Sequence, residues 1–270
     1  MSRIAATFAA LREDRRRALI PFVMGGDPSL ETTESFLTCF SESGADLLEI
    51  GVPFSDPIAD GPINQRAAQR ALAGGAGLTG ILELVGHVRP RLAQPIVLLS
   101  YYNPILQYGL EAFCRRAATA GVDGVVIPDL PPEEGDPLRS AAGPFGIDVI
   151  FLAAPTSTDE RLARVAAGSR GFVYCVSLTG VTGVRANLAA DVGGLVARLR
   201  RQTTLPICVG FGVSTPDHAR QVAAFADGVI VGSAIVSVIE RDGPSAGLAL
   251  TVLVRDLRTG VDSAVGAATS

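Results

Sequence analysis

Runs of apolar residues alternate with amphipathic stretches along most of this chain. The apolar runs are short and contain few charges, which is typical of parallel strands that are covered on both faces. They predict eight strands, at residues 18–24, 46–50, 95–101, 124–128, 148–153, 171–176, 206–209 and 227–231.

The stretches between these runs have the spacing of amphipathic helices. Ser29 and Thr158 are placed to cap helix N-termini, and Pro62 is placed to open a helix. The helices are expected at residues 3–17, 29–43, 63–72, 79–91, 110–120, 132–142, 159–167, 188–202, 215–225, 234–239 and 246–257. We expect the first of them to cover the bottom of a barrel, and the tail at 263–270 to be disordered.

Alternation of strands and helices predicts parallel strands joined by helical crossovers, and eight strands favour a closed (β/α)8 TIM barrel. The competing fold is an open doubly wound sheet. That fold is expected to carry an early glycine-rich fingerprint, which G-G-D-P at 25–28 does not supply. We therefore predict one domain over residues 1–270, with an extra N-terminal helix and an extra short helix after strand eight.

Composition narrows the class of protein. The chain has 270 residues, 48% of them hydrophobic, which suits one domain with a large core. Its 27 acidic residues exceed its 23 basic ones, and only 15–17 forms a basic tract, which argues against a nucleic-acid partner. Four cysteines without CxxC spacing, no signal peptide and no long apolar span predict a cytoplasmic protein. Two histidines leave little scope for a histidine triad or metal cluster.

The stretch at 47–61, L-L-E-I-G-V-P-F-S-D-P-I-A-D-G, carries the strongest chemical signal. Glu49 shares a strand face with Leu47 at the C-terminal end of strand two, where a carboxyl among apolar neighbours is costly without a partner or a task. Asp60 follows on a loop that two prolines keep from becoming helix. The pattern predicts two carboxylates facing one cavity. The alternative is a glutamate that caps a neighbouring loop, together with ordinary turn aspartates.

Two glycine-rich strand ends suggest a phosphate site. They are G-F-G-V-S at 210–214 and G-S-A at 232–234, after strands seven and eight, where TIM barrels bind phosphate. Glycine lets backbone N–H groups approach an anion, and a helix N-terminus adds partial positive charge. The segment 179–183 is expected to close over the same end as a lid, with Thr182 and Gly183 nearest the phosphate. The alternatives are plain turn glycines and a flexible surface loop.

The string at 47–61 resembles the signature of the tryptophan synthase alpha subunit family. The resemblance extends to I-P-F-V-M-G-G-D-P from Ile20, S-L-T-G-V-T-G at 177–183 and G-F-G-V-S at 210–214, and so covers almost the whole chain. By this resemblance Glu49 is the catalytic acid and base, and Asp60 the second catalytic carboxylate. It also implies an indole pocket at Phe22, Leu99, Tyr174 and Phe211, and a phosphate cradle at Gly183, Gly210, Gly212, Gly232 and Ser233.

The same resemblance implies a lyase that cleaves indole-3-glycerol phosphate to indole and glyceraldehyde 3-phosphate in tryptophan biosynthesis. It implies no metal and no organic cofactor in this chain. The implied partner is a pyridoxal-phosphate beta subunit in an alpha2-beta2 heterotetramer. The segment 51–60, with Pro53, Asp56 and Pro57, matches the family's docking loop.

Other functions stay open at this point. A different phosphate-binding barrel enzyme is one, either a sugar-phosphate isomerase or an aldolase whose metal is held by Asp27, Asp56, Asp60 and Asp129. A non-catalytic activator of the beta subunit and a stand-alone indole-releasing lyase are two more. The pairs Gly25-Gly26 and Tyr101-Tyr102 depart from the family's commonest forms, which puts the fine shape of the pocket in doubt.

Overall fold

The strands predicted from the apolar runs form one parallel sheet in the computed structural model, which describes residues 1–176, 185–210 and 212–266. The strands are β1 (Ala18–Met24), β2 (Leu48–Gly51), β3 (Ile96–Leu99), β4 (Gly124–Val126), β5 (Asp148–Ile150), β6 (Leu152–Ala153), β7 (Val173–Val176), β8 (Ile207–Gly210) and β9 (Gly228–Val231). Each predicted strand is present. The stretch 148–153 is divided at Phe151 into β5 and β6, which is why the described strands number nine.

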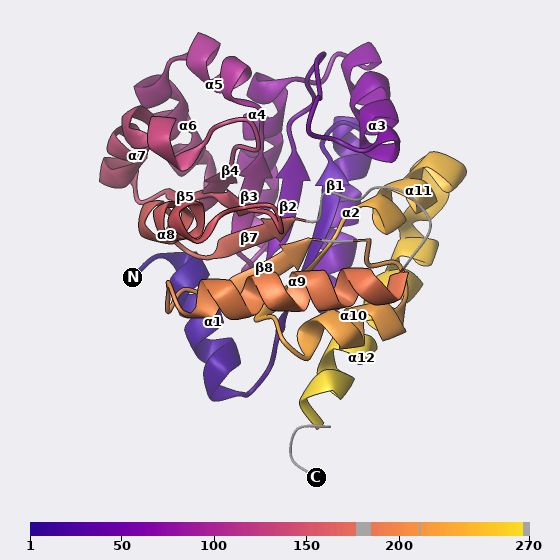
Figure 1. The fold of residues 1–270 in the computed structure, drawn as a ribbon. Coiled ribbons are helices and arrows are strands. Elements are labelled where there is room, and N and C mark those ends of the chain that lie inside the picture. The colour runs from indigo at the N-terminus through magenta and orange to yellow at the C-terminus, as the bar shows by residue number, and fades with distance from the viewer. Residues whose placement is uncertain (177–184, 211, 267–270) are drawn as a thin grey trace.

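Helices follow the strands and surround them (Figure 1). They are α1 (Arg3–Glu13), α2 (Leu30–Glu42), α3 (Pro62–Ala73), α4 (Leu78–Val88), α5 (Tyr102–Tyr108), α6 (Leu110–Ala120), α7 (Asp136–Ala142), α8 (Asp159–Gly168), α9 (Arg185–Arg200), α10 (Pro216–Ala223), α11 (Ser233–Asp242) and α12 (Gly247–Gly266). The predicted caps are confirmed. Ser29 and Thr158 accept N-terminal N–H groups of α2 and α8, and Pro62 is the first residue of α3.

The sheet closes on itself. Its strand order is β5-β4-β3-β2-β1-β9-β8-β7-β6, and every pairing is parallel. Because only Phe151 separates β5 from β6, both ends of this order belong to one stretch of chain, and the ring is complete. The prediction of an eight-position (β/α)8 barrel is confirmed, and the open doubly wound sheet is wrong.

Side chains alternate between the two faces of each strand, as predicted for β2. Leu48 and Ile50 belong to the large core between strands and helices. Leu47 belongs to a separate cluster inside the barrel, with Ile20 and Val97 among its members. Glu49, two residues beyond Leu47, pairs in register with Phe22 on one side and Val97 on the other. The period of two thus directs its carboxyl into the barrel.

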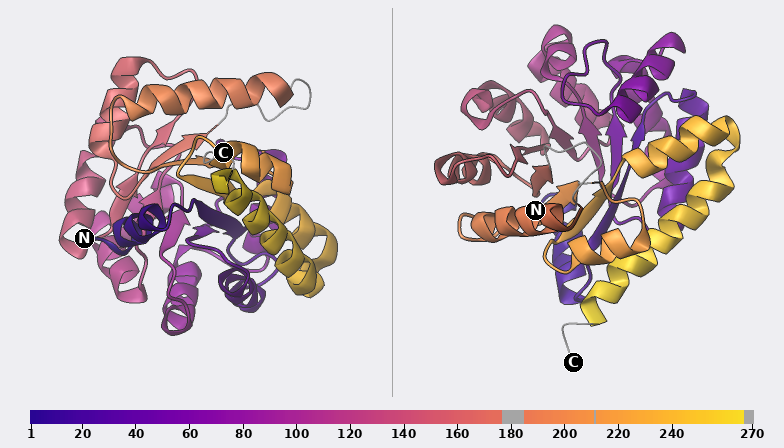
Figure 2. Two further views of the ribbon diagram at one scale, coloured as in Figure 1. Left: turned by 90° about the horizontal axis from the view of Figure 1, so that it is seen from below. Right: turned by 45° about the vertical axis from the view of Figure 1, so that its right-hand side comes forward.

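Helix α1 fills the bottom of the barrel, as expected (Figure 2, left, indigo). Its buried residues Ile4, Phe8 and Leu11 join the cluster inside the barrel, and the ring of Phe8 lies 5.9 Å from that of Phe172. The helix ends at Glu13, so the prediction of helix to residue 17 was too long. The chain leaves the helical conformation at Arg15, whose φ of 54° is left-handed.

Two further differences concern helices. Helix α5 was not predicted, because Y-Y-N-P at 101–104 is typical of a loop that closes a strand. Pro104 is the third residue of α5, and the first four N–H groups of a helix need no partner within it. At the other end of the chain, α12 continues to Gly266, so the expectation of disorder from residue 263 was wrong for its first four residues. Residues 267–270 lie outside the described residues.

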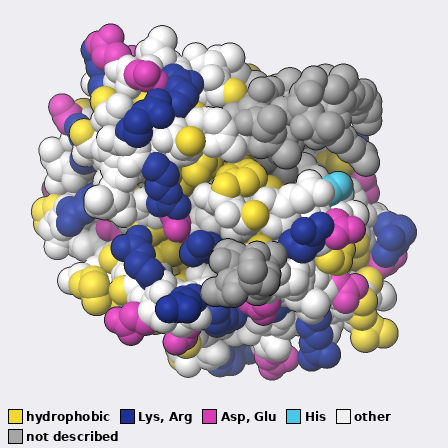
Figure 3. Space-filling view, turned by 60° about the horizontal axis from the view of Figure 1, so that its bottom comes forward, with side chains coloured by type: hydrophobic (Ala, Val, Ile, Leu, Met, Phe, Trp, Pro, Cys, Tyr) yellow, Lys and Arg dark blue, Asp and Glu magenta, His cyan; other side chains and the backbone are white. Residues whose placement is uncertain are grey.

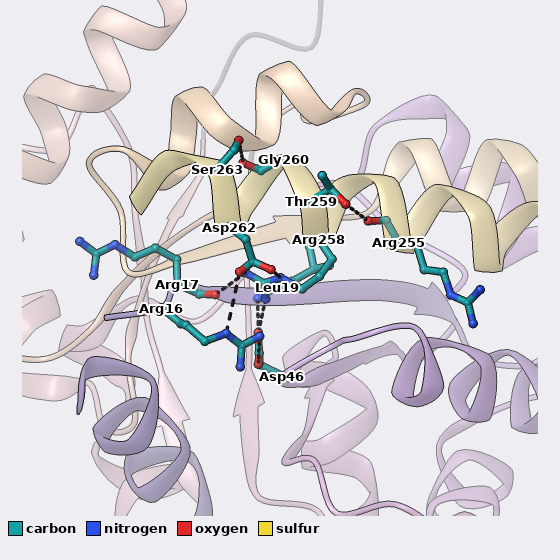
Figure 4. A network of polar contacts seen from close by, with 10 residues as sticks. All are labelled: Arg16, Arg17, Leu19, Asp46, Arg255, Arg258, Thr259, Gly260, Asp262 and Ser263. Atoms are coloured by element: carbon teal, nitrogen blue, oxygen red, sulfur yellow. Dashed lines mark hydrogen bonds and ion pairs between the residues drawn. The ribbon is translucent and has the colours of Figure 1, made fainter. Parts of the chain in front are cut away.

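Arg258 ties the last helix to the first two strands (Figure 4). Its Nη1 donates to Asp46 Oδ2 at 2.6 Å, and its Nη2 donates to the carbonyl of Arg17 at 3.0 Å and to Asp262 at 2.6 Å. Asp46 also accepts the backbone N–H of Leu19 at 2.8 Å. Only 8% of Arg258 is exposed, so this network closes the bottom of the barrel with a nearly buried ion pair.

The surface carries charges of both signs. All 23 basic residues are arginine, and on the lower face they are interspersed with Asp and Glu (Figure 3). Within the described residues, no single helix is long and apolar enough to cross a membrane. The bent pair of α3 with α4 and its following turn meets the same test of length and composition when the two are taken together.

Candidate active site

Glu49 lies at the upper end of β2, inside the barrel, with 1% of its surface exposed. Neither of its carboxyl oxygens has a hydrogen-bond partner among the described residues. Burial raises the pKa of Glu49 to about 8, and the negative charge of Asp60 adds to the rise. The hydroxyl of Tyr174 offsets part of it, although it does not reach hydrogen-bond geometry. A pKa of about 8 means that Glu49 is mostly protonated at neutral pH.

Tyr174 reaches Glu49 from across the barrel. It lies on β7, is 8% exposed, and belongs to the cluster inside the barrel. Its pKa is raised well above the ordinary value by burial and by the nearby charge of Glu49. Its ring fills the space above Gly210, because a Cβ at that position would lie 2.6 Å from the tyrosine hydroxyl. Gly210, expected in the phosphate cradle, thus also makes room for Tyr174.

Asp60 reaches the same end of the barrel from the loop between β2 and α3. Its Oδ2 accepts the hydroxyl of Tyr101 at 2.9 Å, and its carbonyl accepts the side-chain amide of Gln65 at 2.9 Å. Partial burial raises the pKa of Asp60, whereas hydrogen bonds from Tyr101 and Asn64 lower it. These donors stabilise the ionised form. The loop thus brings a hydrogen-bonded carboxylate within electrostatic range of an unpartnered one.

Apolar residues line the space beside Glu49. Phe22, 3% exposed, lies on β1 next to Glu49. Its ring passes between two glycines, since a Cβ on Gly51 would lie 2.8 Å from the ring and one on Gly232 would lie 3.4 Å from it. Leu99, the last residue of β3, packs against the clusters of both Tyr174 and Phe22. These contacts form an apolar wall beside Glu49.

The glycine-rich strand ends lie side by side. Gly210 of β8 pairs in register with Ile230 of β9, so the two following loops start from neighbouring strands. Gly212 has a φ of 46°, and a Cβ added there would meet no atom of the described residues within 4 Å; Gly232 caps α11, whose first residue is Ser233. The start of this ten-residue helix points N–H groups at any anion bound there. Thr182, Gly183, Phe211 and the expected lid at 179–183 lie outside the described residues.

Comparison with known proteins assigns this chain to a family. A family model for the tryptophan synthase alpha chain matches residues 8–259. A tryptophan synthase alpha chain from Geobacter sulfurreducens is 56% identical over 241 residues, which cover 89% of this chain and 91% of the relative. The chain belongs to the tryptophan synthase alpha chain family.

Solved structures agree with this assignment. The crystal structure of tryptophan synthase subunit alpha from Legionella pneumophila matches with a TM-score of 0.91 at 37% identity, covering 97% of this chain and 99% of that one. A crystal structure of tryptophan synthase from M. tuberculosis in its aminoacrylate-bound form matches with a TM-score of 0.87 at 38% identity, covering 97% and 100%. The resemblance found in the motifs is confirmed.

Membership of the tryptophan synthase alpha chain family makes this chain a carbon–carbon lyase of tryptophan biosynthesis that cleaves indole-3-glycerol phosphate. The family also implies a beta-subunit partner. The rival readings as a sugar-phosphate isomerase or a metal-dependent aldolase are thereby set aside. Among the described residues, no three acidic, histidine or cysteine side chains gather as a metal site would require.

The loop of this alpha chain between β2 and α3 presents its middle residues outward. Asp56 is exposed and accepts the hydroxyl of Ser55 at 2.5 Å, and the neighbouring Ile58 is 83% exposed. Pro53 is buried and Pro57 partly so. The two prolines therefore anchor the loop on the barrel while its tip projects an acid and an apolar side chain.

Tyr101 contacts Asp60, although the sequence motifs gave this tyrosine no role in the site. It was noted only as part of a departure from the family's commonest forms. It is 2% exposed, its hydroxyl donates to Asp60, and the same oxygen accepts the N–H of Ala59 at 2.9 Å. The sequence could have indicated this contact. Tyr101 lies two residues beyond Leu99, so its side chain continues the inner face of β3 and points toward the site.

Proposed function

We propose that Glu49 and Asp60 together cleave indole-3-glycerol phosphate in this barrel. The observation that carries the proposal is the buried carboxyl of Glu49, which has no hydrogen-bond partner among the described residues and lies within the electrostatic reach of Asp60. Such a group is costly to keep in a folded protein, and perturbed carboxyls of this kind cluster at active sites.

The first step is protonation of the substrate. Carbon 3 of the indole ring is a poor carbanion, so its bond to the side chain cannot break directly. Glu49, with a pKa of about 8, donates its proton to carbon 3 at neutral pH. The ring becomes an indolenine, whose nitrogen carries the positive charge. Asp60, ionised and hydrogen-bonded to Tyr101, stabilises that charge.

Bond cleavage then returns the proton. The Glu49 carboxylate removes the proton of the hydroxyl on the adjacent side-chain carbon, and that carbon becomes the aldehyde of glyceraldehyde 3-phosphate. The electrons of the broken bond restore the aromatic ring and neutralise its nitrogen. Indole leaves, Glu49 is again protonated, and no step needs a metal or an organic cofactor in this chain.

The rest of the pocket holds the substrate in our proposal. Phe22, Leu99, Tyr174 and Phe211 enclose the ring. Gly210, Gly212, Gly232 and Ser233, with Thr182 and Gly183, bind the phosphate through backbone N–H groups and the start of α11. This mode of binding requires no lysine, and the chain contains none.

The partner in this proposal is a pyridoxal-phosphate beta subunit, joined in an alpha2-beta2 heterotetramer in the cytoplasm. Asp56, Pro53 and Pro57 form the docking surface, which is supported by the outward-facing tip of their loop. We further propose that residues 1–270 form a single domain. Size-exclusion chromatography with light scattering, on this chain mixed with the beta subunit, measures the complex. Two separate peaks would contradict the partner assignment.

The experiment for the reaction is an assay of indole release by the purified chain, with and without the beta subunit. Glu49→Gln is expected to abolish cleavage, and Asp60→Asn to reduce kcat severely, because a neutral amide cannot balance the charge on the ring. Glu42→Gln makes the same chemical change on an exposed residue of α2 and serves as the control. Near-normal turnover by Glu49→Gln would remove Glu49 from the mechanism. A change in KM alone for Asp60→Asn would make Asp60 a binding residue.

A further inference from the structure

A cluster of four charged residues joins α3 to α11 beside the candidate active site. Arg70 donates through Nε and Nη2 to both oxygens of Asp27, at 2.8 and 2.7 Å, and through Nη1 to Glu240 at 2.8 Å. Arg66 donates through Nε and Nη2 to both oxygens of Glu240, at 2.7 and 2.8 Å. The two arginines come from α3 and Glu240 from α11, and these helices pack side by side (Figure 1).

The cluster runs from the buried Asp27 to partly exposed side chains, with Glu240 30%, Arg70 34% and Arg66 50% exposed. Asp27 is 1% exposed, and both bidentate contacts use the planar fork of arginine, which fixes orientation as well as distance. The hydrogen bond from Arg66 lowers the pKa of Glu240 to about 2, so this carboxylate stays ionised at any working pH.

Besides the partly buried Ile63, helix α3 packs through small apolar side chains. Its buried residues are three alanines, Ala67, Ala68 and Ala71. They pack in a small cluster that also contains Phe22 and Val236 of α11, apart from the main core. Alanine buries little area and does not interlock with its neighbours, so small rotations of α3 meet little apolar resistance.

The first turn of α3 holds Asp60. The side-chain amide of Gln65 donates to the carbonyl of Asp60 at 2.9 Å, and the nearby Asn64 lowers the pKa of its carboxyl group. Arg66 and Arg70 lie on the following turns of the same helix. On the other side of the cluster, α11 begins at Ser233, in the candidate phosphate cradle. A rotation of α3 against α11 would therefore move Asp60 relative to the bound substrate.

We propose that Arg66, Arg70 and Glu240 are positioning residues that hold α3 against α11 and so set the position of Asp60 relative to the phosphate-binding end of the barrel. The inference rests on the proposed role of Asp60. Its consequence is that loosening the cluster lowers kcat more than it raises KM. The phosphate-binding strands and α11 keep their own contacts, whereas misplacing a charge-stabilising group by a fraction of an ångström weakens the transition state.

Glu240→Gln is the variant to test. Replacing Arg70 would leave the buried Asp27 carboxylate without its cation and could prevent folding. Glu240→Gln leaves the Arg70–Asp27 pair intact. The matched control is Asp242→Asn, which removes the carboxylate that Arg241 binds at 2.7 and 2.6 Å on the same helix; among the described residues Asp242 has no ion pair with α3. Arg66→Gln is a second variant, which removes only the contact of Arg66 with Glu240.

We expect Glu240→Gln to lower kcat for indole release about tenfold, with KM changed less than threefold, and Arg66→Gln to lower kcat about threefold. The alkaline limb of the pH profile of kcat/KM should shift in Glu240→Gln, because the charge of Asp60 helps to raise the pKa of Glu49 and the distance between the two groups would change. Asp242→Asn should match the parent chain in kcat, KM and pH profile.

Three results would overturn the proposal. One is a kcat and a pH profile of Glu240→Gln equal to those of the parent chain, with Asp60→Asn impaired; this outcome leaves the proposed reaction intact. Another is an equal loss of kcat in Asp242→Asn, which would reveal a general effect of altering α11. The third is normal turnover by Asp60→Asn, which would refute the role of Asp60 in the reaction and the positioning role with it.

Discussion

A carboxyl group lies near each end of β2, and the two groups differ in their hydrogen-bond partners. Asp46, just before the strand, accepts the backbone N–H of Leu19 and a hydrogen bond from Arg258, and Arg16 forms an ion pair with it at 3.7 Å. Glu49, near the other end, is more deeply buried and has no hydrogen-bond partner among the described residues. Burial raises the pKa of both groups, but only at Asp46 do cations and a backbone donor oppose the rise.

The difference shows that the two ends of the barrel use charged residues for different purposes. The lower end, where α1, α12 and the Arg258 network meet, uses its charges to hold elements together (Figure 4). The upper end holds Glu49 without a hydrogen-bond partner among the described residues, which lowers the stability of the fold. In TIM barrels the C-terminal ends of the strands carry the chemistry and the other end carries stability, and here that division separates two residues only three positions apart.

The largest effect on stability is expected from removing Arg258 at the lower end of the barrel. Arg258→Ala should lower the free energy of unfolding by about 3 to 5 kcal/mol, because it leaves Asp46 nearly buried without its main cation. Arg255→Ala is the control, since Arg255 lies one turn away on α12 and extends outward in Figure 4. Chemical denaturation measures both. Folded Arg258→Ala should keep its kcat, and a selective loss of kcat would show that the two ends are not independent.

A smaller effect is expected where the upper end is tightly packed. Gly210→Ala would put a Cβ 2.6 Å from the Tyr174 hydroxyl and should cost about 1 to 3 kcal/mol of stability. Because Tyr174 must move, the pocket beside Glu49 should change and kcat should fall. Gly194→Ala, on α9, where the added Cβ meets no atom of the described residues within 4 Å, is the matched control. Unchanged melting and turnover in Gly210→Ala would mean that Tyr174 has freedom the packing does not suggest.

The third prediction concerns the pH dependence of stability. Glu49 titrates near 4.5 in the unfolded chain and near 8 in the folded one. Between these values only the folded state holds the proton, so the free energy of unfolding falls as pH rises, by up to about 1.4 kcal/mol per pH unit. Above about pH 8 both states are ionised and this slope ends.

Glutamine does not titrate, so Glu49→Gln should lack this slope. Denaturation at several pH values should find the variant close to the parent chain near pH 5 and increasingly more stable toward pH 8. Glu42→Gln, on the surface, should follow the parent chain throughout. Parallel curves for Glu49→Gln and the parent chain would show that Glu49 is ionised, and paired, in the folded state.

The smallest effect is expected at Tyr101. Tyr101→Phe removes the donor to Asp60 and the acceptor for Ala59, which should cost about 1 kcal/mol in transition-state stabilisation and lower kcat several-fold. Tyr108→Phe, on α5, is the control. Steady-state kinetics distinguish the two, and a kcat equal to that of the parent chain would make Tyr101 a packing residue only.

Several features of the site could not be read from local patterns. The contact of Tyr101 with Asp60 joins residues 41 positions apart, and the pairing of Glu240 with Arg66 joins residues 174 apart. No periodicity links such positions, since they meet only after the ring of strands has closed. Gly210 illustrates the same limit. As a strand-end glycine it suggested backbone contact with phosphate, whereas the space it leaves is filled by a side chain from the neighbouring strand.

The sequence by itself determined the strands, the helices that follow them and the direction of Glu49, because side-chain alternation and helical spacing are local properties of the chain. Its motifs also identified the family. Only the tertiary structure decided that Glu49 has no hydrogen-bond partner among the described residues while Asp46 has several, and that α3 is fastened to α11 through arginines. The reason is physical. The charge state of a carboxyl depends on which groups surround it within a few ångströms, and closure of the barrel selects those groups from distant parts of the chain.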